Sequence, residues 1–350
     1  MIEANFLIKS EFRLLSLILF FTMIISKTPV RVSFFGGGTD YPDYYKTNGG
    51  AVLSTTIDKY IYVAVRQMTG IFDVKYRIAY SKLELCNEVD EIQHTVVKAC
   101  IKYLKIEGGL EINIISDLPA RTGIGSSSSF TVGLLNALYS MQGIFKTKDE
   151  LAHEAIYVEQ TLLNERVGVQ DQLAAAYGGL NYMTFQTDNQ LVVEPVIISE
   201  ARLNDLQNNL MMFYTGVSRF AHQVLEEQIK NIKENKITPN MIRIRQMVDD
   251  GLSILKEEKD LVLYGELMHE AWMAKRGLSS AISNDFLDDI YNRAKEAGAI
   301  GGKLLGAGGG GFFVFYVPNE MKKAVSIALN DLHEIPFRFE NEGTSIIYNA

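Results

Sequence analysis

The chain has 350 residues, which is enough for two domains of ordinary size. Hydrophobic residues make up 47% and charged residues 22% of the sequence, a balance typical of a globular protein with a sizeable core. The net charge of −8 argues against a protein that binds nucleic acid, although it leaves room for a local basic pocket that holds an anionic substrate. Cys86 and Cys100 lack the spacing of a metal or redox motif, so we expect two free thiols in a reducing, cytoplasmic compartment.

The N-terminus contains an uncharged, almost wholly apolar stretch, Leu14–Ser26, which follows Lys9 and Arg13. It resembles the core of a signal peptide, but no cleavage site with small residues follows it. It is also shorter than the ~20 residues that cross a bilayer, so we expect no association with a membrane. We expect Met23 to be the true start and residues 1–22 to be a non-native or disordered extension; secretion is the less favoured alternative.

The first half of the chain is predicted to be β-rich, with helices between the strands. The predicted elements are, in chain order, strands over Ser26–Phe35, Gly50–Val65 and Lys75–Ala79, a helix over Ile92–Leu104, a strand over Leu110–Ile115, helices from the serine run to about Met141 and over Lys148–Asn164, and a hairpin of Leu180–Phe185 and Leu191–Val196 about Asp188-Asn189.

The second half is predicted to be mostly helical, and Pro195 marks a plausible domain boundary before it. The predicted elements are helices over Arg219–Glu234, Asn240–Glu257, Leu261–Ser279 and Asn284–Ala297, a glycine-rich segment over Gly298–Phe312, and a strand over Phe312–Val317. We therefore expect one domain over residues 23–195 and a second over residues 196–350.

The stretch Leu118–Phe130 (L-P-A-R-T-G-I-G-S-S-S-S-F) joins a glycine turn to serine hydroxyls at a predicted helix start. Glycine can take a positive φ and lets a ligand approach the backbone closely. A helix N-terminus presents unpaired N–H groups and a partial positive charge, so it attracts phosphate. We expect phosphate binding here rather than a Ser/Gly linker, because the stretch leads directly into an amphipathic, leucine-rich segment.

Several familiar catalytic motifs are absent from the sequence. The glycine segments near the two ends lack the G-K-[ST] of a Walker loop and the G-x-G-x-x-G of a dinucleotide-binding fold. His153 and His269 lack the second histidine of an H-E-x-x-H zinc motif, so we expect both on helix surfaces.

Four segments together resemble the GHMP kinase superfamily, over almost the whole chain from Met23 onward. They are Pro29–Tyr41 (P-V-R-V-S-F-F-G-G-G-T-D-Y), Leu118–Phe130, Gly168–Leu180 (G-V-Q-D-Q-L-A-A-A-Y-G-G-L) and Gly302–Phe312 (G-K-L-L-G-A-G-G-G-G-F). The resemblance implies an α+β protein with the GHMP kinase fold. It implies an N-terminal domain like domain 2 of ribosomal protein S5, a ferredoxin-like C-terminal domain, and an active site between them.

Within the superfamily, Pro29–Tyr41 and Lys275–Asn284 (K-R-G-L-S-S-A-I-S-N) resemble the D-glycero-D-manno-heptose 7-phosphate kinases. Galactokinases have an acid and a histidine at the positions of Gly37 and Gly38. That departure disfavours galactose and opens space above the sugar for a longer, seven-carbon substrate. Fucose kinases carry a related glycine turn and are the nearest alternative.

The resemblance implies two catalytic residues, Asp171 and Arg31. Asp171 would accept the proton of the attacking hydroxyl, and Arg31 would favour its ionised form and neutralise charge in the transition state. We expect the two side chains to meet beside a nucleotide held by the serine turn. The alternatives are a helix cap for Asp171 and an ordinary ion pair at a strand end for Arg31.

The resemblance also implies a Mg²⁺ site, with Glu159 and Ser127 as the expected ligands. Relatives keep the corresponding carboxylate one residue nearer to the catalytic aspartate, so the register of Glu159 is open and Glu165 is the substitute. Ser126 is the alternative hydroxyl, and a free surface glutamate is the alternative reading of Glu159.

The expected ligand-binding residues fall into three sets. ATP is assigned to the serine turn, through Pro119, Gly123, Ile124, Gly125, Ser126, Ser127, Ser128 and Ser129. The sugar is assigned to the two glycine segments, through Gly37, Gly38, Thr39, Asp40, Lys303, Gly306, Gly308, Gly309 and Gly310, with a turn-forming role as the alternative for the Thr-Asp pair. A phosphate on the sugar is assigned to a set of cations, which are Lys303, Lys275, Arg276, Arg219 and Arg121.

The expected function is an ATP-dependent, Mg²⁺-dependent kinase that phosphorylates O1 of D-glycero-D-manno-heptose 7-phosphate for the synthesis of nucleotide-activated heptose. The alternatives are a fucose-like or other sugar 1-kinase, and a non-catalytic relative that senses sugar and nucleotide. The sequence does not decide the oligomeric state, and a homodimer is one option.

Overall fold

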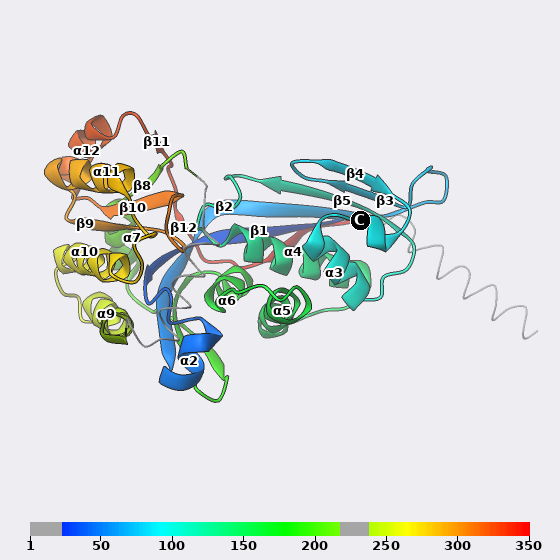
Figure 1. The fold of residues 1–350 in the computed structure, drawn as a ribbon, viewed down its shortest axis with the longest axis horizontal. Helices are drawn as coiled ribbons and strands as arrows, with labels where there is room; N and C mark the ends of the chain where they lie inside the picture. Colours follow the sequence, from blue (N-terminus) through cyan, green and yellow to red (C-terminus); the bar gives the residue numbers. More distant parts are fainter. Residues whose placement is uncertain (1–22, 218–237) are drawn as a thin grey trace, which may run out of the picture.

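The computed structural model describes residues 23–217 and 238–350, which form two β-sheets with helices packed against them (Figure 1). The expected extension over residues 1–22 and the predicted helix over Arg219–Glu234 lie outside the described residues. Among the described residues, no helix is long and apolar enough to cross a membrane.

The larger sheet has nine strands among the described residues, in the order β13-β1-β2-β5-β3-β4, with β6, β7 and β12 attached through β2. Its strands are β1 (Met23–Phe35), β2 (Gly50–Met68), β3 (Tyr76–Ala79), β4 (Leu83–Cys86), β5 (Gly109–Ser116), β6 (Leu180–Phe185), β7 (Leu191–Pro195), β12 (Phe339–Glu340) and β13 (Ser345–Asn349). The 19-residue β2 serves two partners, because its first residues pair with β6 and its last residues pair with β5.

Helices cover one face of this sheet, below the strands in Figure 1. The helices of this half are α2 (Pro42–Asn48), α3 (Thr95–Tyr103), α4 (Ser126–Met141), α5 (Lys148–Ile156) and α6 (Gln170–Tyr177), with a 3₁₀ turn at Val89–Glu91 and a π-helix at Tyr157–Leu162. The π-helix continues α5 without a break, where the sequence predicted one helix over Lys148–Asn164.

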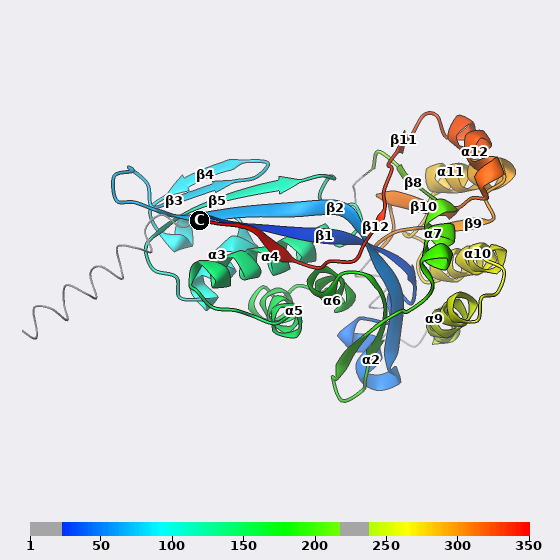
Figure 2. The same cartoon turned by 180° about the vertical axis from the view of Figure 1, so that it is seen from behind.

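The smaller sheet is antiparallel, in the order β11-β8-β10-β9. Its strands are β8 (Leu210–Tyr214), β9 (Gly301–Leu304), β10 (Phe312–Tyr316) and β11 (His333–Glu334). The helices of this half are α7 (Glu200–Asn208), α9 (Thr238–Lys256), α10 (Val262–Arg276), α11 (Asp285–Glu296) and α12 (Lys322–Ala328), with a 3₁₀ turn at Asn319–Met321. In both views α9 and α10 lie below the strands and α11 and α12 above them (Figures 1 and 2).

The end of the chain does not stay within the predicted second domain, residues 196–350. Residues of β12 and β13 were expected in the second domain, but they pair with β2 and β1 of the larger sheet. Thr344 also bonds across to this half, since its hydroxyl lies 2.8 Å from the Thr28 hydroxyl. Pairing with β13 satisfies backbone groups of β1 that would otherwise lie at an open sheet edge. The local sequence does not predict this pairing, because the two strands lie at opposite ends of the chain.

The two halves pack directly on each other. Lys303 of β9 donates a hydrogen bond of 2.8 Å to the carbonyl of Phe34 in β1. Gly251 of α9 lies so close to the Phe35 ring that an added Cβ would come within 2.6 Å of it. These contacts leave a cleft between the halves, at the end of β1.

Candidate active site

A cleft of about 220 Å³ opens where β1, the serine turn, the start of α6 and the late glycine loop converge. It is lined by Arg31, Ser33, Gly37, Gly38, Asp40, Tyr41, Arg121, Gly123, Gly125, Ser126, Ser127, Ser128, Val167, Gly168, Gln170, Asp171, Lys275, Leu278, Lys303, Gly306 and Ala307. All four segments singled out in the sequence therefore contribute to one site.

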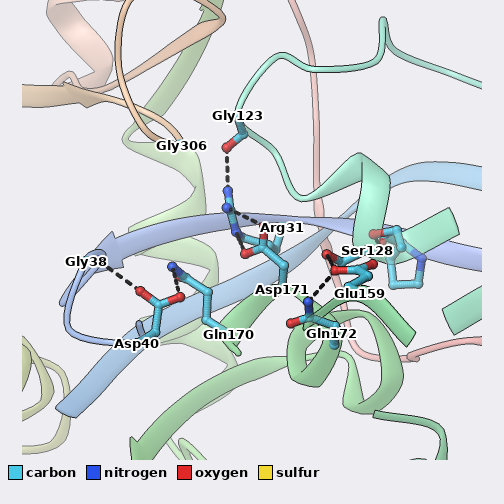
Figure 3. Close-up of polar contacts among 12 residues, drawn as sticks. Arg31, Gly38, Asp40, Gly123, Ser128, Glu159, Gln170, Asp171, Gln172 and Gly306 are labelled. Atoms are coloured by element: carbon cyan, nitrogen blue, oxygen red, sulfur yellow. Dashed lines mark hydrogen bonds and ion pairs between the residues drawn. The ribbon is translucent and has the colours of Figure 1, made fainter. Parts of the chain in front are cut away.

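Arg31 and Asp171 form a bidentate ion pair on the wall of the cleft (Figure 3). Arg31 Nε donates to Asp171 Oδ1 at 2.8 Å and Nη2 donates to Oδ2 at 3.0 Å. A third donor, Nη1, bonds the carbonyl of Gly123 at 2.5 Å, which ties the pair to the serine turn. Arg31 is 4% exposed, whereas the Asp171 side chain keeps access to the cleft at 25%. The carboxylate is thus fixed in place and still reachable by a ligand.

Asp171 is not the cap of α6. Val169 occupies the N-cap position, and Asp171 lies in the first turn of the helix. Gly125 lies directly over the ion pair, because an added Cβ there would be 3.3 Å from both Arg31 Cγ and Asp171 Cγ. The closeness of the serine turn to Asp171 therefore depends on a residue without a side chain.

The turn after β1 holds a second carboxylate of the cleft, Asp40. Asp40 accepts hydrogen bonds from the Gly38 N–H at 2.9 Å and from Gln170 Nε2 at 3.0 Å (Figure 3). Burial, with the negative charge of Asp171 as the second cause, raises the pKa of Asp40. Gly168 allows the approach, since an added Cβ would come within 1.8 Å of Asp40 Oδ2.

The serine turn ends in the N-terminus of α4, which faces the cleft. Gly125 is the N-cap in a left-handed conformation, with φ of 75°, and makes no side-chain cap. The first turn of α4 contains no acidic residue. Ser126 and Ser127 line the cleft beside these N–H groups, so this end of the helix is suited to bind an anion.

Glu159 lies behind the serine turn, next to Ser128 rather than Ser127. Its Oε2 accepts from Ser128 Oγ at 2.9 Å and from Gln172 Nε2 at 2.5 Å (Figure 3). Its Oε1 is buried and has no hydrogen-bond partner among the described residues. Burial raises the pKa of Glu159 to about 7. The reading of Glu159 as a free surface residue is wrong, because it is 1% exposed.

Two buried lysines reach the cleft from the second half of the chain. Lys275 of α10 donates to the carbonyls of Leu304, at 3.0 Å, and of Gly306, and Lys303 donates to Phe34. Neither has a carboxylate partner within the described part of the chain. Burial lowers the pKa of Lys275 well below its ordinary value and, together with the charge of Arg31, lowers that of Lys303 to about 7. An anion between them would stabilise both charges.

Not every predicted ligand residue faces the cleft. Thr39 is fully buried, and its hydroxyl lies 2.8 Å from the carbonyl oxygens of both Gly36 and Ala51, so the turn-forming role is correct for it. Ser129 bonds the carbonyl of Pro29, and the carbonyl of Ile124 accepts from the Arg31 N–H. These residues shape the turns, and Pro119 likewise does not line the cleft.

The late glycine loop also contributes less than expected. Gly306 lines the cleft, but Gly308, Gly309 and Gly310 do not. Gly309 donates to the carbonyl of Ile282, and added Cβ atoms at Gly308 and Gly310 would meet the backbone of Ile282 and Val217. These three glycines allow close packing of backbone on backbone rather than access for a ligand.

The predicted set of cations divides in the same way. Lys275, Lys303 and Arg121 line the cleft. Arg276 does not, because it is paired with Asp288 at 2.5 Å. Arg219 lies outside the described residues.

Sequence reasoning missed several residues of the site. Ser33, Tyr41 and Gln170 line the cleft, and each belongs to a segment that the sequence singled out. The available signal was adjacency, since Gln170 precedes Asp171 and Tyr41 follows Asp40. Ser33 is two positions from Arg31 on the same strand, and alternate residues of a strand share a face.

The arrangement can support the transfer of an anionic group. It combines a fixed carboxylate able to accept a proton, a helix N-terminus able to bind phosphate, and three buried basic side chains, Arg31, Lys275 and Lys303. The Asp40 turn adds acceptors for ligand hydroxyl groups.

Two family models match the chain. The model of the GHMP kinases N terminal domain matches residues 93–179, and the model of the GHMP kinases C terminal domain matches residues 253–330. The first match includes the serine turn, Glu159 and Asp171, and the second includes both lysines.

Individual relatives extend the likeness to most of the chain. The chain is 30% identical over 305 residues to D-glycero-alpha-D-manno-heptose 7-phosphate kinase of Campylobacter jejuni, covering 84% of this chain and 89% of that protein. It is 26% identical over 307 residues to the bifunctional fucokinase/GDP-fucose pyrophosphorylase of Arabidopsis thaliana, covering 81% of this chain and 29% of that protein. The crystal structure of a D-glycero-D-manno-heptose 1-phosphate kinase from Bacteroides thetaiotaomicron superimposes with a TM-score of 0.76 and 25% identity, covering 93% and 99% of the two chains.

Proposed function

This chain belongs to the GHMP kinase family, whose members are ATP-dependent phosphotransferases with an alcohol acceptor, and we propose that it phosphorylates O1 of D-glycero-D-manno-heptose 7-phosphate to give the 1,7-bisphosphate. The observation that carries the proposal is the Arg31–Asp171 pair beneath the serine turn. One relative named as a heptose 7-phosphate kinase supports this substrate. The solved structure named as a heptose 1-phosphate kinase supports a heptose phosphate but not the position of its phosphate.

Asp171 accepts the proton of the attacking hydroxyl in this mechanism. Its carboxylate faces the cleft, and the two hydrogen bonds from Arg31 hold its orientation before the substrate arrives. A group of this kind contributes typically 10²–10⁴-fold to a rate. Arg31 stays charged throughout, so it also offsets the negative charge that accumulates around the transferred phosphoryl group.

ATP would supply the phosphoryl group, and the residues that fit its phosphates are those of the serine turn. The N-terminus of α4 offers backbone N–H donors, and Ser126 and Ser127 add hydroxyl groups. Gly123 and Gly125, with φ of 82° and 75°, give the turn its shape.

The residues around Glu159 fit a magnesium ion, which would neutralise phosphate charge when bound. Glu159 Oε1 has no partner among the described residues, and Ser128 Oγ lies beside Oε2. Hard oxygen ligands of this kind suit Mg²⁺, which keeps most of its other positions for water and phosphate. The hydroxyl beside Glu159 belongs to Ser128, so we assign Ser128 rather than Ser127 to this role.

The two lysines favour an acceptor that carries a phosphate of its own. Lys275 and Lys303 are buried in the cleft wall with only carbonyl partners, and Arg121 is exposed at its rim. Buried ammonium groups without a carboxylate are stabilised when an anion binds between them. With a neutral sugar, the phosphates of the nucleotide would be the only ligand anions available to the two lysines.

A sugar 1-kinase acting on a neutral sugar such as L-fucose is the second candidate, because relatives named as fucokinases also match. A non-catalytic sensor of sugar and nucleotide is a third, but the Arg31–Asp171 pair gives no reason to prefer it. As a heptose kinase in the cytoplasm, the protein would serve the synthesis of nucleotide-activated heptose for surface polysaccharide.

The test is a substrate panel with purified protein and Mg-ATP, with ADP release as the readout. The panel contains heptose 7-phosphate, heptose 1-phosphate, L-fucose, galactose and mevalonate. We expect turnover of heptose 7-phosphate, with a new anomeric phosphate seen by ³¹P NMR. Turnover of another member, with heptose 7-phosphate untouched, would overturn the proposal.

A further inference from the structure

The three glycines after β1 are glycine for different reasons. Gly36 has φ of 87°, and an added Cβ would come within 1.9 Å of the Ala51 carbonyl oxygen. Gly38 has φ of 102°, a conformation that other residues rarely adopt. Gly37 is not among the residues with positive φ. An added Cβ at Gly37 would meet only Ser33 Oγ at 3.8 Å and Gln170 Nε2 at 3.9 Å, which is ordinary van der Waals contact. The fold therefore has no need of glycine at this position.

The space over Gly37 belongs to the cleft. Gly37, Ser33 and Gln170 all line it. Ser33 and Gln170 are 5% and 8% exposed, so their polar atoms are largely withdrawn from bulk water. They come from separate segments, β1 and the first residue of α6, and meet only in the folded chain.

Both side chains carry a polar atom without a partner. Gln170 Nε2 donates to Asp40 Oδ2, but Gln170 Oε1 has no hydrogen-bond partner among the residues that the structure describes (Figure 3). Ser33 Oγ also lacks one within the same residues. Most buried polar groups are hydrogen-bonded, so two unpaired atoms beside one open position indicate a missing polar partner.

We propose that Gly37, Ser33 and Gln170 form a subsite that binds one hydroxyl group of the acceptor sugar. The sugar occupies the space that a side chain at position 37 would fill. Its hydroxyl donates to Gln170 Oε1 and shares a hydrogen bond with Ser33 Oγ, while Gln170 keeps Asp40 in position. The inference rests on the proposed function in taking the acceptor to be a sugar, and it adds the residues that distinguish one sugar from another.

Ser54 provides a matched control. It stands opposite Ser33 in the β1–β2 ladder, is 1% exposed, and its Oγ likewise has no partner among the described residues. Ser54 does not line the cleft. The competing explanation is a buried water molecule that bonds to both serines. It predicts that Ser33→Ala and Ser54→Ala have the same effect on Tm and on KM for the sugar.

The test compares Gly37→Ala, Ser33→Ala and Ser54→Ala in the full chain. Gly37→Ala is expected to raise KM for the sugar at least tenfold, because the methyl group occupies the subsite. Ser33→Ala is expected to raise KM roughly tenfold, the loss of one hydrogen bond to substrate. For both, KM for ATP stays within twofold and Tm does not fall, since no existing contact is removed. Ser54→Ala leaves KM for the sugar unchanged.

Monodeoxy analogues of the accepted sugar identify the hydroxyl that is bound. We expect that wild-type protein binds one of the analogues, the one that lacks the recognised hydroxyl, more weakly than the full sugar. With that analogue, Ser33→Ala should lower affinity no further, because the hydrogen bond to Ser33 is already missing. The proposal is overturned if Gly37→Ala and Ser33→Ala keep KM for the sugar within twofold of wild type. It is also overturned if Ser33→Ala and Ser54→Ala change Tm alike without changing KM.

Failure of this inference is separable from failure of the proposed function. If the wild-type protein phosphorylates another sugar but not heptose 7-phosphate, the substrate assignment fails and the variants are tested with the sugar that is accepted. If heptose 7-phosphate is accepted and the variants behave as wild type, only the subsite is wrong. If no sugar is bound or phosphorylated, both are wrong.

Discussion

Asp171 and Arg31 lie 140 positions apart in the chain and meet through two parallel hydrogen bonds. A paired carboxylate and guanidinium can simply stabilise a fold, or the carboxylate can serve as a base. The exposure of Asp171 to the cleft, with Arg31 buried behind it, favours the second role.

Asp171→Asn is expected to lower kcat by roughly 10²–10⁴-fold, because the amide cannot take up the proton of the attacking hydroxyl. Its shape still allows a hydrogen bond from Arg31, so we expect Tm and KM for ATP to change little. Steady-state kinetics with ADP detection measures kcat and KM, and a thermal melt measures Tm.

Asp149→Asn is the control for this variant, since Asp149 occupies the first turn of α5 as Asp171 occupies that of α6. It lies outside the cleft and is expected to retain full turnover. Undiminished kcat in Asp171→Asn would remove the residue from the mechanism. A wild-type protein that binds sugar and nucleotide without consuming ATP would favour the sensor.

Lys303→Met is expected to change how stability depends on pH. Burial and the charge of Arg31 lower the pKa of Lys303 to about 7 in the folded protein, against an ordinary value of 10.5. The charged form is therefore disfavoured by folding, and the wild type loses stability, relative to the variant, as pH falls from about 10 to 7. The variant should be more stable at pH 7 by on the order of 4 kcal/mol, a gap that narrows toward pH 10.

Urea denaturation of both proteins at several pH values measures this gap. Added inorganic phosphate should stabilise the wild type more than the variant at pH 7, because binding of an anion restores the charged lysine. A gap that is the same at pH 7 and pH 10 would contradict the shifted pKa.

At the scale of single elements, α4 connects the serine turn to the larger sheet. Gly133 of α4 accepts from Ser26 Oγ at 2.8 Å, and Ser129 Oγ donates to Pro29 at 2.8 Å, so the helix is attached to β1 at two points. The position of the N-terminus of α4 therefore depends on how closely the helix approaches the strand.

Gly133→Ala is expected to destabilise the protein, although alanine favours helix by up to ~1 kcal/mol over glycine. An added Cβ would lie 2.5 Å from Thr28 Oγ1 and 3.2 Å from Ser26 Oγ. Overpacking of this kind costs roughly 1–3 kcal/mol, so we expect Tm to fall by about 2–6 °C in a thermal melt. Gly70→Ala, which would meet nothing within 4 Å, is the control and should leave Tm unchanged. If Gly133→Ala has the same Tm as the wild type, α4 can move away from β1 without loss of stability.

The segment that carries Glu159 is a π-helix rather than an α-helical continuation of the helix before it. Glu159 stands one residue farther from Asp171 than the resemblance implied, and the segment Tyr157–Leu162 takes one residue more per turn than an α-helix. The Leu163 N–H bonds the carbonyl of Val158, five residues back. Glu159 lies within this π-helix and accepts the hydrogen bond from Ser128.

At the scale of the whole molecule, the last residues of the chain complete the half that contains the serine turn. β13 pairs with β1 from Ile24 to Lys27, and Thr344 also accepts a hydrogen bond from Asn136 of α4 at 3.2 Å. The strand that carries Arg31 is therefore flanked by segments from opposite ends of the chain.

Deletion of residues 339–350 is expected to lower Tm and to abolish ATP binding together, because it exposes the edge of β1 and removes support from α4. Thermal melts and nucleotide titration measure the two effects. Tyr348→Ser, a change at a 47% exposed position of β13, is the control and should affect neither. Normal ATP binding by the truncated chain would mean that β1 and α4 hold their positions without β13.

Features that depend on neighbouring residues could be predicted from the amino-acid sequence. Alternation of apolar residues predicted β1 and β2, helical spacing predicted α4, and the turn glycines predicted where the chain bends toward a ligand. The motifs identified the kinase family, because phosphate binding requires a set of residue types that stand close together in the chain.

Which candidate residues reach the cleft became clear from the folded chain alone. Thr39 and Ser129 turn inward to bond carbonyls, Gly308 to Gly310 pack on backbone, and Ser33 and Gln170 line the site instead. The pairing of β13 with β1 was equally invisible from the sequence. Burial and unpaired charge arise from contacts between distant segments, and a local pattern of residues carries no information about which segment will cover another.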